Sequence, residues 1–190
     1  MSWVRDIEKL TAYLRSLSIR NNDEEEIEAS KGFKLWAEYT LGVREKRKTV
    51  FLIGNGASAS MASHVAADLA KNAHIHTEVF SDLSLITAIA NDISFEEVFA
   101  EPLRRRMTPG DMLVAISSSG QSTNILRAAG EAKNLGGIVV TLSAMKYDNP
   151  LRKQGILNFY LPAETYSLAE TCHAAILHHW IDEMVSAISK

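Results

Sequence analysis

Two short loops rich in glycine and serine, at residues 54–60 and 117–122, most constrain what this chain can fold into. Each follows an apolar run with β-branched residues, at 49–53 and 112–116, and each leads into a segment with helical spacing. Glycines let the backbone approach a ligand closely, and the amide groups and dipole at a helix start favour negative charge. The pattern therefore predicts a phosphorylated ligand bound at the carboxyl ends of parallel strands.

The order of the remaining segments predicts the fold class. Strands are expected at 49–53, 112–116, 138–142 and 159–161, with a further short strand that ends at 79–80. Helices are expected at 58–72, 83–90, 95–106, 123–135 and 167–188. Their alternation predicts an α/β domain of three αβα layers around a parallel, doubly wound sheet of roughly five strands. Right-handed crossovers would place both Gly/Ser loops at the same edge of that sheet.

Residues 1–47 precede the alternating part and are expected to form two helices, at about 2–18 and 23–43. The second helix begins with the acids at 23–26 and is followed by bases at 44–48, which suits the helix dipole at both ends. These helices either cover the sheet or build an interface between subunits.

Two features of the second helix bear on that choice. Gly32 in its interior predicts close packing against a neighbouring helix. The aromatic residues Trp36 and Tyr39 favour the subunit interface. We therefore expect one domain over 1–190, with an α/β core at 48–190 and N-terminal helices used in oligomerisation.

Composition excludes several classes of partner. The formal net charge is -3 and the chain has no long basic block, which argues against nucleic acid. No apolar run approaches the roughly 20 residues needed to span a bilayer, and no signal peptide is expected, so no membrane partner is predicted. Cys172 is the only cysteine, which fits a reducing, cytoplasmic location and indicates a small core residue rather than a nucleophile.

His64 and Asp68 are the first candidates for chemistry. They lie four residues apart on the helix that leaves the first loop, so they share one face. A histidine and a carboxylate at this spacing can bind one metal ion or act as a base with its orienting partner. The alternative is a polar pair on the surface.

The last helix carries Glu170, His173, His178 and His179 within ten residues. Glu170 and His178 lie about 80° apart around the helix but about 12 Å apart along it, so they could reach one ion only by leaning together or from different subunits. His173 and His178 diverge by about 140° and are not expected to serve the same site. The alternative is that these histidines pack between helices.

Asn91 and Asp92 are expected in a loop between two helices after the second strand. They either cap the following helix or hydrogen-bond sugar hydroxyls. A dinucleotide site is a weaker hypothesis, because Ala59 stands where a third glycine is needed and no acid ends the second strand.

Taken together, these residues resemble the sugar isomerase (SIS) domain family and, within it, the phosphoheptose isomerases. The markers are the run 54–60, His64 with Asp68, the run 87–92, the run 117–122, and Glu170 with His173 and His178. The resemblance covers nearly the whole chain. It implies a homotetramer with active sites between subunits, which interconverts sedoheptulose 7-phosphate and a manno-heptose 7-phosphate for surface polysaccharide or lipopolysaccharide synthesis.

The resemblance also implies roles for individual residues. Those expected to bind the phosphate are Ser117, Ser118, Ser119 and Ser122, with Ser58 as a further hydroxyl donor. Those expected to line the sugar are Asn55, Gly56, Ala57, Asn91, Asp92 and Glu170. Those expected to bind zinc are His64, Asp68, Glu170 and His178, and Asp68 and His178 are the expected acid/base pair.

Three positions depart from the usual pattern of phosphoheptose isomerases. Asp68 stands where they usually have Glu, Glu170 where they have Gln, and Ser167 where they have Asp. Two alternatives therefore stay open, namely an isomerase of another ketose phosphate and a non-catalytic SIS protein that binds a phosphosugar. The chain retains His64, Asp68 and His178, which favours an enzyme.

Overall fold

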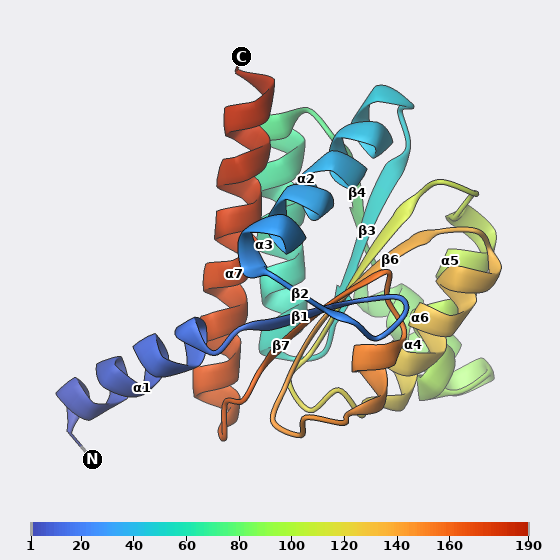
Figure 1. Cartoon of the computed structure of the whole chain (residues 1–190). Coiled ribbons are helices and arrows are strands. Elements are labelled where there is room, and N and C mark those ends of the chain that lie inside the picture. Colours follow the sequence, from blue (N-terminus) through green and yellow to red (C-terminus); the bar gives the residue numbers. More distant parts are fainter. Residues whose placement is uncertain (1, 190) are drawn as a thin grey trace.

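The computed structural model describes residues 2–189 as helices packed on both faces of a seven-stranded sheet (Figure 1). The strands are β1 (Ser18–Asn21), β2 (Glu26–Ile27), β3 (Thr49–Gly54), β4 (His76–Val79), β5 (Met112–Ser117), β6 (Ile138–Ala144) and β7 (Leu157–Leu161). The helices are α1 (Trp3–Arg15), α2 (Ala29–Glu45), α3 (Ala57–Ala73), α4 (Leu83–Asp92), α5 (Ala100–Arg106), α6 (Thr123–Asn134) and α7 (Tyr166–Ile188), with short 3₁₀ turns η1 (Phe95–Glu97) and η2 (Pro150–Lys153).

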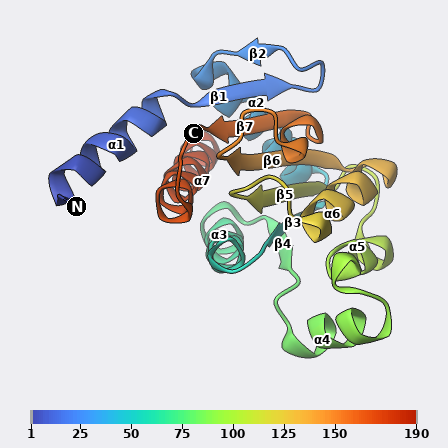
Figure 2. The same cartoon turned by 90° about the horizontal axis from the view of Figure 1, so that it is seen from below.

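The strand order is β2-β1-β7-β6-β5-β3-β4, and the five strands from β7 to β4 are parallel. This confirms the predicted α/β class and the parallel core. Successive side chains of a strand point to opposite faces. Accordingly, Val50 and Leu52 of β3 pack under α2, α3 and α7, whereas Phe51 and Ile53 pack under the layer from α4 to α6. Figure 2 shows α3 and α7 on one side of the sheet and α5 and α6 on the other.

The N-terminal segment differs from the prediction, because residues 18–27 form the antiparallel hairpin β1–β2 rather than the start of a helix. The Asn21 side chain accepts hydrogen bonds from the backbone N–H groups of Asp23 and Glu25, and this arrangement closes a turn. Helix α2 begins at Ala29, where the carboxylate of Glu28 accepts two backbone N–H bonds. The acids at 23–26 therefore belong to the hairpin, which adds β1 antiparallel to β7.

Two expectations about α2 are also corrected. Trp36 is fully buried and stacks on Trp180 of α7 with ring centroids 4.1 Å apart, so this aromatic belongs to the core and not to an interface. Gly32 does pack closely, but its neighbour is a strand. A Cβ atom at position 32 would lie 2.6 Å from the Cδ1 atom of Ile19 in β1.

The predicted boundaries of two further helices were wrong. Helix α4 continues through Asn91 and Asp92, so these residues lie in a last helical turn and not in a loop. The helix expected at 95–106 is divided into η1 and α5. Pro102 has no backbone N–H and is tolerated only in the first turn of a helix, which is consistent with a new helix that starts at Ala100.

Helix α1 extends away from the rest of the molecule (Figure 1). Its side chains Trp3, Val4, Ile7 and Leu14 are exposed, with 75% of Trp3 accessible. Only the end near β1 packs on the core, through Leu10 and Tyr13. An amphipathic helix with an uncovered apolar face is typical of contact with another chain. Within residues 2–189, no helix combines the length and the apolar character that a membrane crossing would need.

Candidate active site

The two Gly/Ser loops meet at one edge of the sheet, as predicted. Strands β3 and β5 are parallel neighbours, with Gly54 paired to Ile116, so the loops that follow them lie side by side. They enclose a pocket of about 210 Å³. Its lining residues are Asn55, Ser58, Ile116, Ser117, Ser118, Ser119, Ser122, Tyr166 and Glu170. We call this cavity the serine pocket.

Local backbone geometry explains why these loops need glycine. Gly56 and Gly120 have φ angles of 56° and 63°, in the left-handed region. A Cβ atom on Gly54 would lie 2.6 Å from backbone and side-chain atoms of Ser58, so only glycine lets α3 start this close to β3. Helix α3 begins at Ala57, within the first Gly/Ser run, and Ser122 is the N-terminal cap of α6. Two helix N-termini therefore adjoin the serine pocket, and both favour an anion there.

A reciprocal pair of amides joins the two halves of the pocket. The Nδ2 atom of Asn55 donates to Oδ1 of Asn124 at 2.9 Å, and Nδ2 of Asn124 donates to Oδ1 of Asn55 at 2.9 Å. Asn124 lies in the first turn of α6 and is buried. Asn124 and the pocket-lining Tyr166 were not among the predicted site residues. A polar residue at a predicted buried helix position was the available signal for Asn124.

The residues that line the serine pocket can bind an anion through uncharged hydrogen-bond donors. The pocket offers hydroxyls, the amide of Asn55 and one carboxylate, Glu170, but no lysine or arginine. The Oγ atom of Ser118 is buried and has no hydrogen-bond partner among the described residues. A buried hydroxyl without a partner is costly unless a ligand supplies one.

Three titratable side chains form a second group beside this pocket. His64 and Asp68 project from α3, and His178 from α7; each offers a ligand atom, and these atoms lie within 4.8 Å of one another. The Nε2 atom of His64 is 3.3 Å from Oδ2 of Asp68. The rings of His64 and His178 meet edge to face with centroids 5.3 Å apart. Asp68 and His178 are thus neighbours within one chain, as the isomerase hypothesis requires.

Two imidazoles and one carboxylate form a donor set that fits a zinc ion with an open coordination position. Glu170 is not part of this group within one chain. It lies two helical turns before His178 and lines the serine pocket, which agrees with its other predicted role beside the substrate. Its role as a zinc ligand stays a prediction.

A second cavity lies between α3 and α7. A cavity of about 240 Å³ is lined on one side by α3, including His64, and on the other by α7, including Ala174 and His178. From Ser58 to His64 the rise along α3 is about 9 Å, and from Glu170 to His178 along α7 it is about 12 Å. Both helices thus contribute residues to the serine pocket and, about 9 to 12 Å further along their axes, to the His64–Asp68–His178 group.

Other predicted sugar-binding residues lie at or beyond the edge of the pocket. Gly56 lines a neighbouring, mainly apolar cavity of about 220 Å³, and Ala57 is the exposed first residue of α3. Asn91 and Asp92 are exposed and hydrogen-bond each other at 2.8 Å. Asp92 lines a separate cleft between α4 and α5. The chain by itself does not bring this pair to the serine pocket, so their contact with substrate stays a prediction.

The remaining candidates on α7 have different environments. His173 is fully buried, and burial lowers its pKa to about 4. His179 is exposed and packs edge to face on Phe33. Cys172 is buried, and burial raises the pKa of its thiol, so it is an inert core residue as expected.

Comparison with known proteins supplies the family. A phosphoheptose isomerase of Mycobacterium tuberculosis is 39% identical over 132 residues, which span 64% of this chain and 64% of that protein, so less than two thirds of its length is matched. A phosphoheptose isomerase of Helicobacter pylori is 35% identical over 144 residues, 70% of this chain and 72% of that protein. The structure of a phosphoheptose isomerase from Neisseria gonorrhoeae aligns with a TM-score of 0.77 at 23% identity, over 96% of this chain and 92% of that one.

The match to a family extends over most of the chain. The SIS domain family matches residues 13–144, a segment that includes both Gly/Ser loops, His64 and Asp68. Since the segment exceeds half of the 190 residues, the chain belongs to the SIS domain family.

Proposed function

We propose that this protein is an aldose–ketose isomerase that converts D-sedoheptulose 7-phosphate to D-glycero-D-manno-heptose 7-phosphate. One observation supports this most strongly. A pocket suited to an anion and an imidazole–carboxylate group are both built on the same pair of helices, α3 and α7. The proposal includes a cytoplasmic location, which the lone Cys172 fits.

The reaction moves a carbonyl from C2 to C1 through an enediol. In the proposed mechanism, Asp68 takes the proton from C1 of the ketose and returns it to C2. His178 moves the hydroxyl proton from O1 to O2, so atoms and charge balance. A carboxylate and an imidazole held close together suit these two transfers.

His64, Asp68 and His178 would also hold zinc, which supplies Lewis-acid stabilisation of the enediolate oxygens when bound. A carboxylate has two oxygens and an imidazole two nitrogens. Each side chain can therefore bind an ion through one atom and handle a proton through the other.

The separation of the two sites along α3 and α7 supports a seven-carbon substrate. An extended chain advances about 1.2 Å per bond, so phosphorus and C1 of an open-chain heptulose 7-phosphate lie about 10 Å apart. The same estimate gives about 7 Å for a pentulose 5-phosphate. The rises of about 9 Å from Ser58 to His64 and about 12 Å from Glu170 to His178 match the longer molecule.

The zinc-loaded protein is therefore expected to turn over sedoheptulose 7-phosphate with a kcat/KM at least about tenfold above that for five- or six-carbon ketose phosphates. Chromatographic quantification of the aldose product measures this directly. Preference for a shorter sugar would indicate a related isomerase. Tight binding of all these sugars without any turnover would contradict the enzyme and favour the binding-protein alternative.

We further propose that the protein assembles as a homotetramer through α1. The uncovered apolar face of this helix supports contact with a second copy. Replacing both Ile7 and Leu14 by Lys is expected to reduce the molar mass measured by light scattering after size-exclusion chromatography, because buried lysines would oppose association. Glu8→Lys, on an exposed position of the same helix, is the control. An unchanged mass for the double variant would contradict a role of α1 in assembly.

A further inference from the structure

The segment between β6 and β7 contacts the loop at 117–122, which lines the serine pocket. The backbone N–H of Leu151 donates to the carbonyl of Gly120 at 3.1 Å, and that of Ala144, the last residue of β6, donates to the carbonyl of Ser118 at 2.9 Å. Gly120 also packs so closely on the side chain of Asn149 that any Cβ atom would overlap it. The shape of the loop at 117–122 therefore depends on where Asn149 lies.

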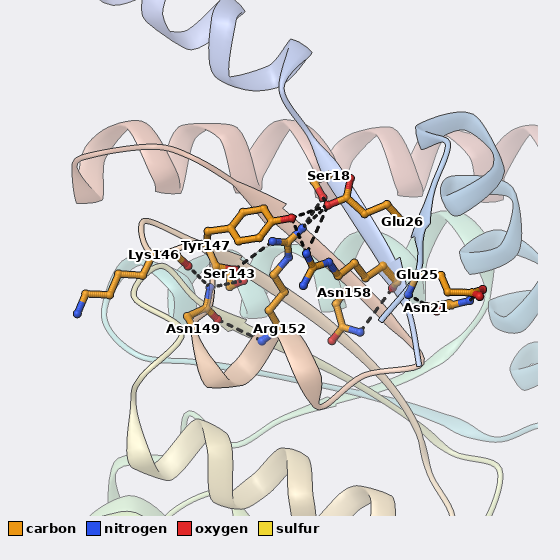
Figure 3. A network of polar contacts seen from close by, with 11 residues as sticks. Ser18, Asn21, Glu25, Glu26, Ser143, Lys146, Tyr147, Asn149, Arg152 and Asn158 are labelled. Carbon is orange, nitrogen blue, oxygen red and sulfur yellow. Dashed lines mark hydrogen bonds and ion pairs between the residues drawn. The ribbon is translucent and has the colours of Figure 1, made fainter. Parts of the chain in front are cut away.

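Asn149 uses its whole amide to shape this segment (Figure 3). It is buried, with 1% of its surface accessible. Its Nδ2 atom donates to the carbonyl of Lys146 at 2.8 Å and to Oγ of Ser143 at 3.1 Å. Its Oδ1 atom accepts from the backbone N–H of Arg152 at 3.1 Å and so caps η2. The side chain behind Gly120 is therefore fixed from several directions.

Arg152 connects the same segment to the N-terminal hairpin. Its side chain is 1% exposed, and its guanidinium carbon lies 4.3 Å from the ring centroids of both Tyr147 and Tyr160. It donates to the carbonyl of Tyr147 at 3.0 Å and to Oγ of Ser18 in β1, and its Nη2 atom lies 3.4 Å from Oε1 of Glu26 in β2. A buried cation is tolerated only with such partners.

Within the described residues, Glu26 is the only acid that pairs with Arg152 and with the neighbouring Arg20. The Nη2 atom of Arg20 lies 3.5 Å from the same Oε1 atom and 2.5 Å from the hydroxyl of Tyr147. That hydroxyl donates to Glu26 at 3.0 Å. Hydrogen bonds from Tyr147 and Ser18 lower the pKa of Glu26, which keeps the carboxylate charged. The hairpin thus supplies the counter-charge for Arg152.

We propose that Asn149 and Arg152 are positioning residues, which hold the loop at 117–122 in the shape that binds the phosphate of the substrate. This inference rests on the proposed function only for the identity of the sugar, because phosphate binding can be measured without turnover. Neither residue lines the serine pocket, and neither belongs to the His64–Asp68–His178 group. Their loss should therefore weaken phosphate binding and leave proton transfer almost unchanged.

Asn149→Ser is the test variant, because serine retains a cap for η2 but loses the amide donors. We expect the KM for the sugar phosphate and the Kd for inorganic phosphate to rise together by about 10- to 100-fold, with kcat within about threefold of the parent. Arg152→Met should likewise raise the KM and the Kd for phosphate while kcat stays almost unchanged. Arg152→Lys should show a smaller rise in both constants, since lysine retains the charge but not the planar fork of donors.

Asn158→Ala is the matched control. Asn158 is equally buried at 1% exposed and also hydrogen-bonds within this region, to Thr141 and Gly155, but it does not contact the loop at 117–122. We expect it to lower the thermal midpoint without changing the Kd for phosphate. If Arg152→Met does not fold, the same measurements on Asn149→Ser and Arg152→Lys test the proposal.

The outcomes separate this inference from the proposed function. A parent protein that binds phosphate but does not isomerise the sugar would contradict the isomerase, whereas the phosphate Kd of the variants would still decide the positioning role. Equal phosphate Kd values for the parent and Asn149→Ser would overturn that role, as would equal weakening in Asn158→Ala. A parent protein that binds neither phosphate nor the sugar phosphate would overturn both proposals.

Discussion

Replacing Asp68 by Asn, or His178 by Gln, is expected to lower kcat for sedoheptulose 7-phosphate by about 10²- to 10⁴-fold. Both replacements keep the size and much of the polarity of the side chain but remove its ability to accept and return a proton. The proposed phosphate contacts lie in the serine pocket, which neither Asp68 nor His178 lines. The Kd for inorganic phosphate should therefore change little, and calorimetry can measure it in the same preparations.

Two controls separate loss of proton transfer from other causes. His179→Gln replaces a neighbouring exposed imidazole that lies outside the His64–Asp68–His178 group, so its kcat should stay near that of the parent. Metal analysis of each variant distinguishes loss of zinc from loss of chemistry at retained zinc. Parent-like turnover by both Asp68→Asn and His178→Gln would remove them from the mechanism.

His173→Leu is expected to reduce the acid sensitivity of the fold. In the folded chain, burial lowers the pKa of His173 to about 4. An unfolded histidine has a pKa of about 6.5, so between these values the unfolded state binds the proton and the folded state does not. Stability then rises with pH across this window and is lost as the pH falls below about 6.5.

The expected size of this effect follows from the shift. From pH 7.5 to pH 5, the free energy of unfolding of the parent should fall by about 2 kcal/mol more than that of His173→Leu. At pH 7.5 the variant should be at least as stable, because neither ring nitrogen of His173 has a hydrogen-bond partner among the described residues. Urea titrations at both pH values measure this difference.

His76→Gln is the control for that experiment, since it removes an exposed imidazole at the start of β4. It should keep the acid sensitivity of the parent. The same pH dependence in the parent and in His173→Leu would show that His173 does not couple protonation to unfolding.

The parts of the fold that the sequence predicted are those with a local signal. The apolar runs at 49–53 and 112–116 and the Gly/Ser turns after them identified β3, β5 and the serine pocket. The four-residue spacing of His64 and Asp68 was enough to place them on one helical face. The order of the strands along the chain and the rule of right-handed crossovers were then enough to predict that the two loops lie together.

The errors arose where distant contacts decide the outcome. The hairpin at 18–27 is short and polar, and it exists because β1 pairs with β7 more than 130 residues later in the chain. Trp36 looked like an interface residue because only the fold shows that Trp180 covers it. Likewise, no spacing rule links Asn55 to Asn124, although this pair joins the two halves of the pocket.

The reciprocal amide pair has a consequence for how a ligand arrives. Since Asn124 is buried and each amide satisfies the other, the separation of the two turns is set during folding and does not await the phosphoryl group. Binding of a phosphoryl group would therefore cost little further conformational entropy of the two turns. The proposed phosphate site is thus preorganised, and we expect binding there to need no ordering of the two turns.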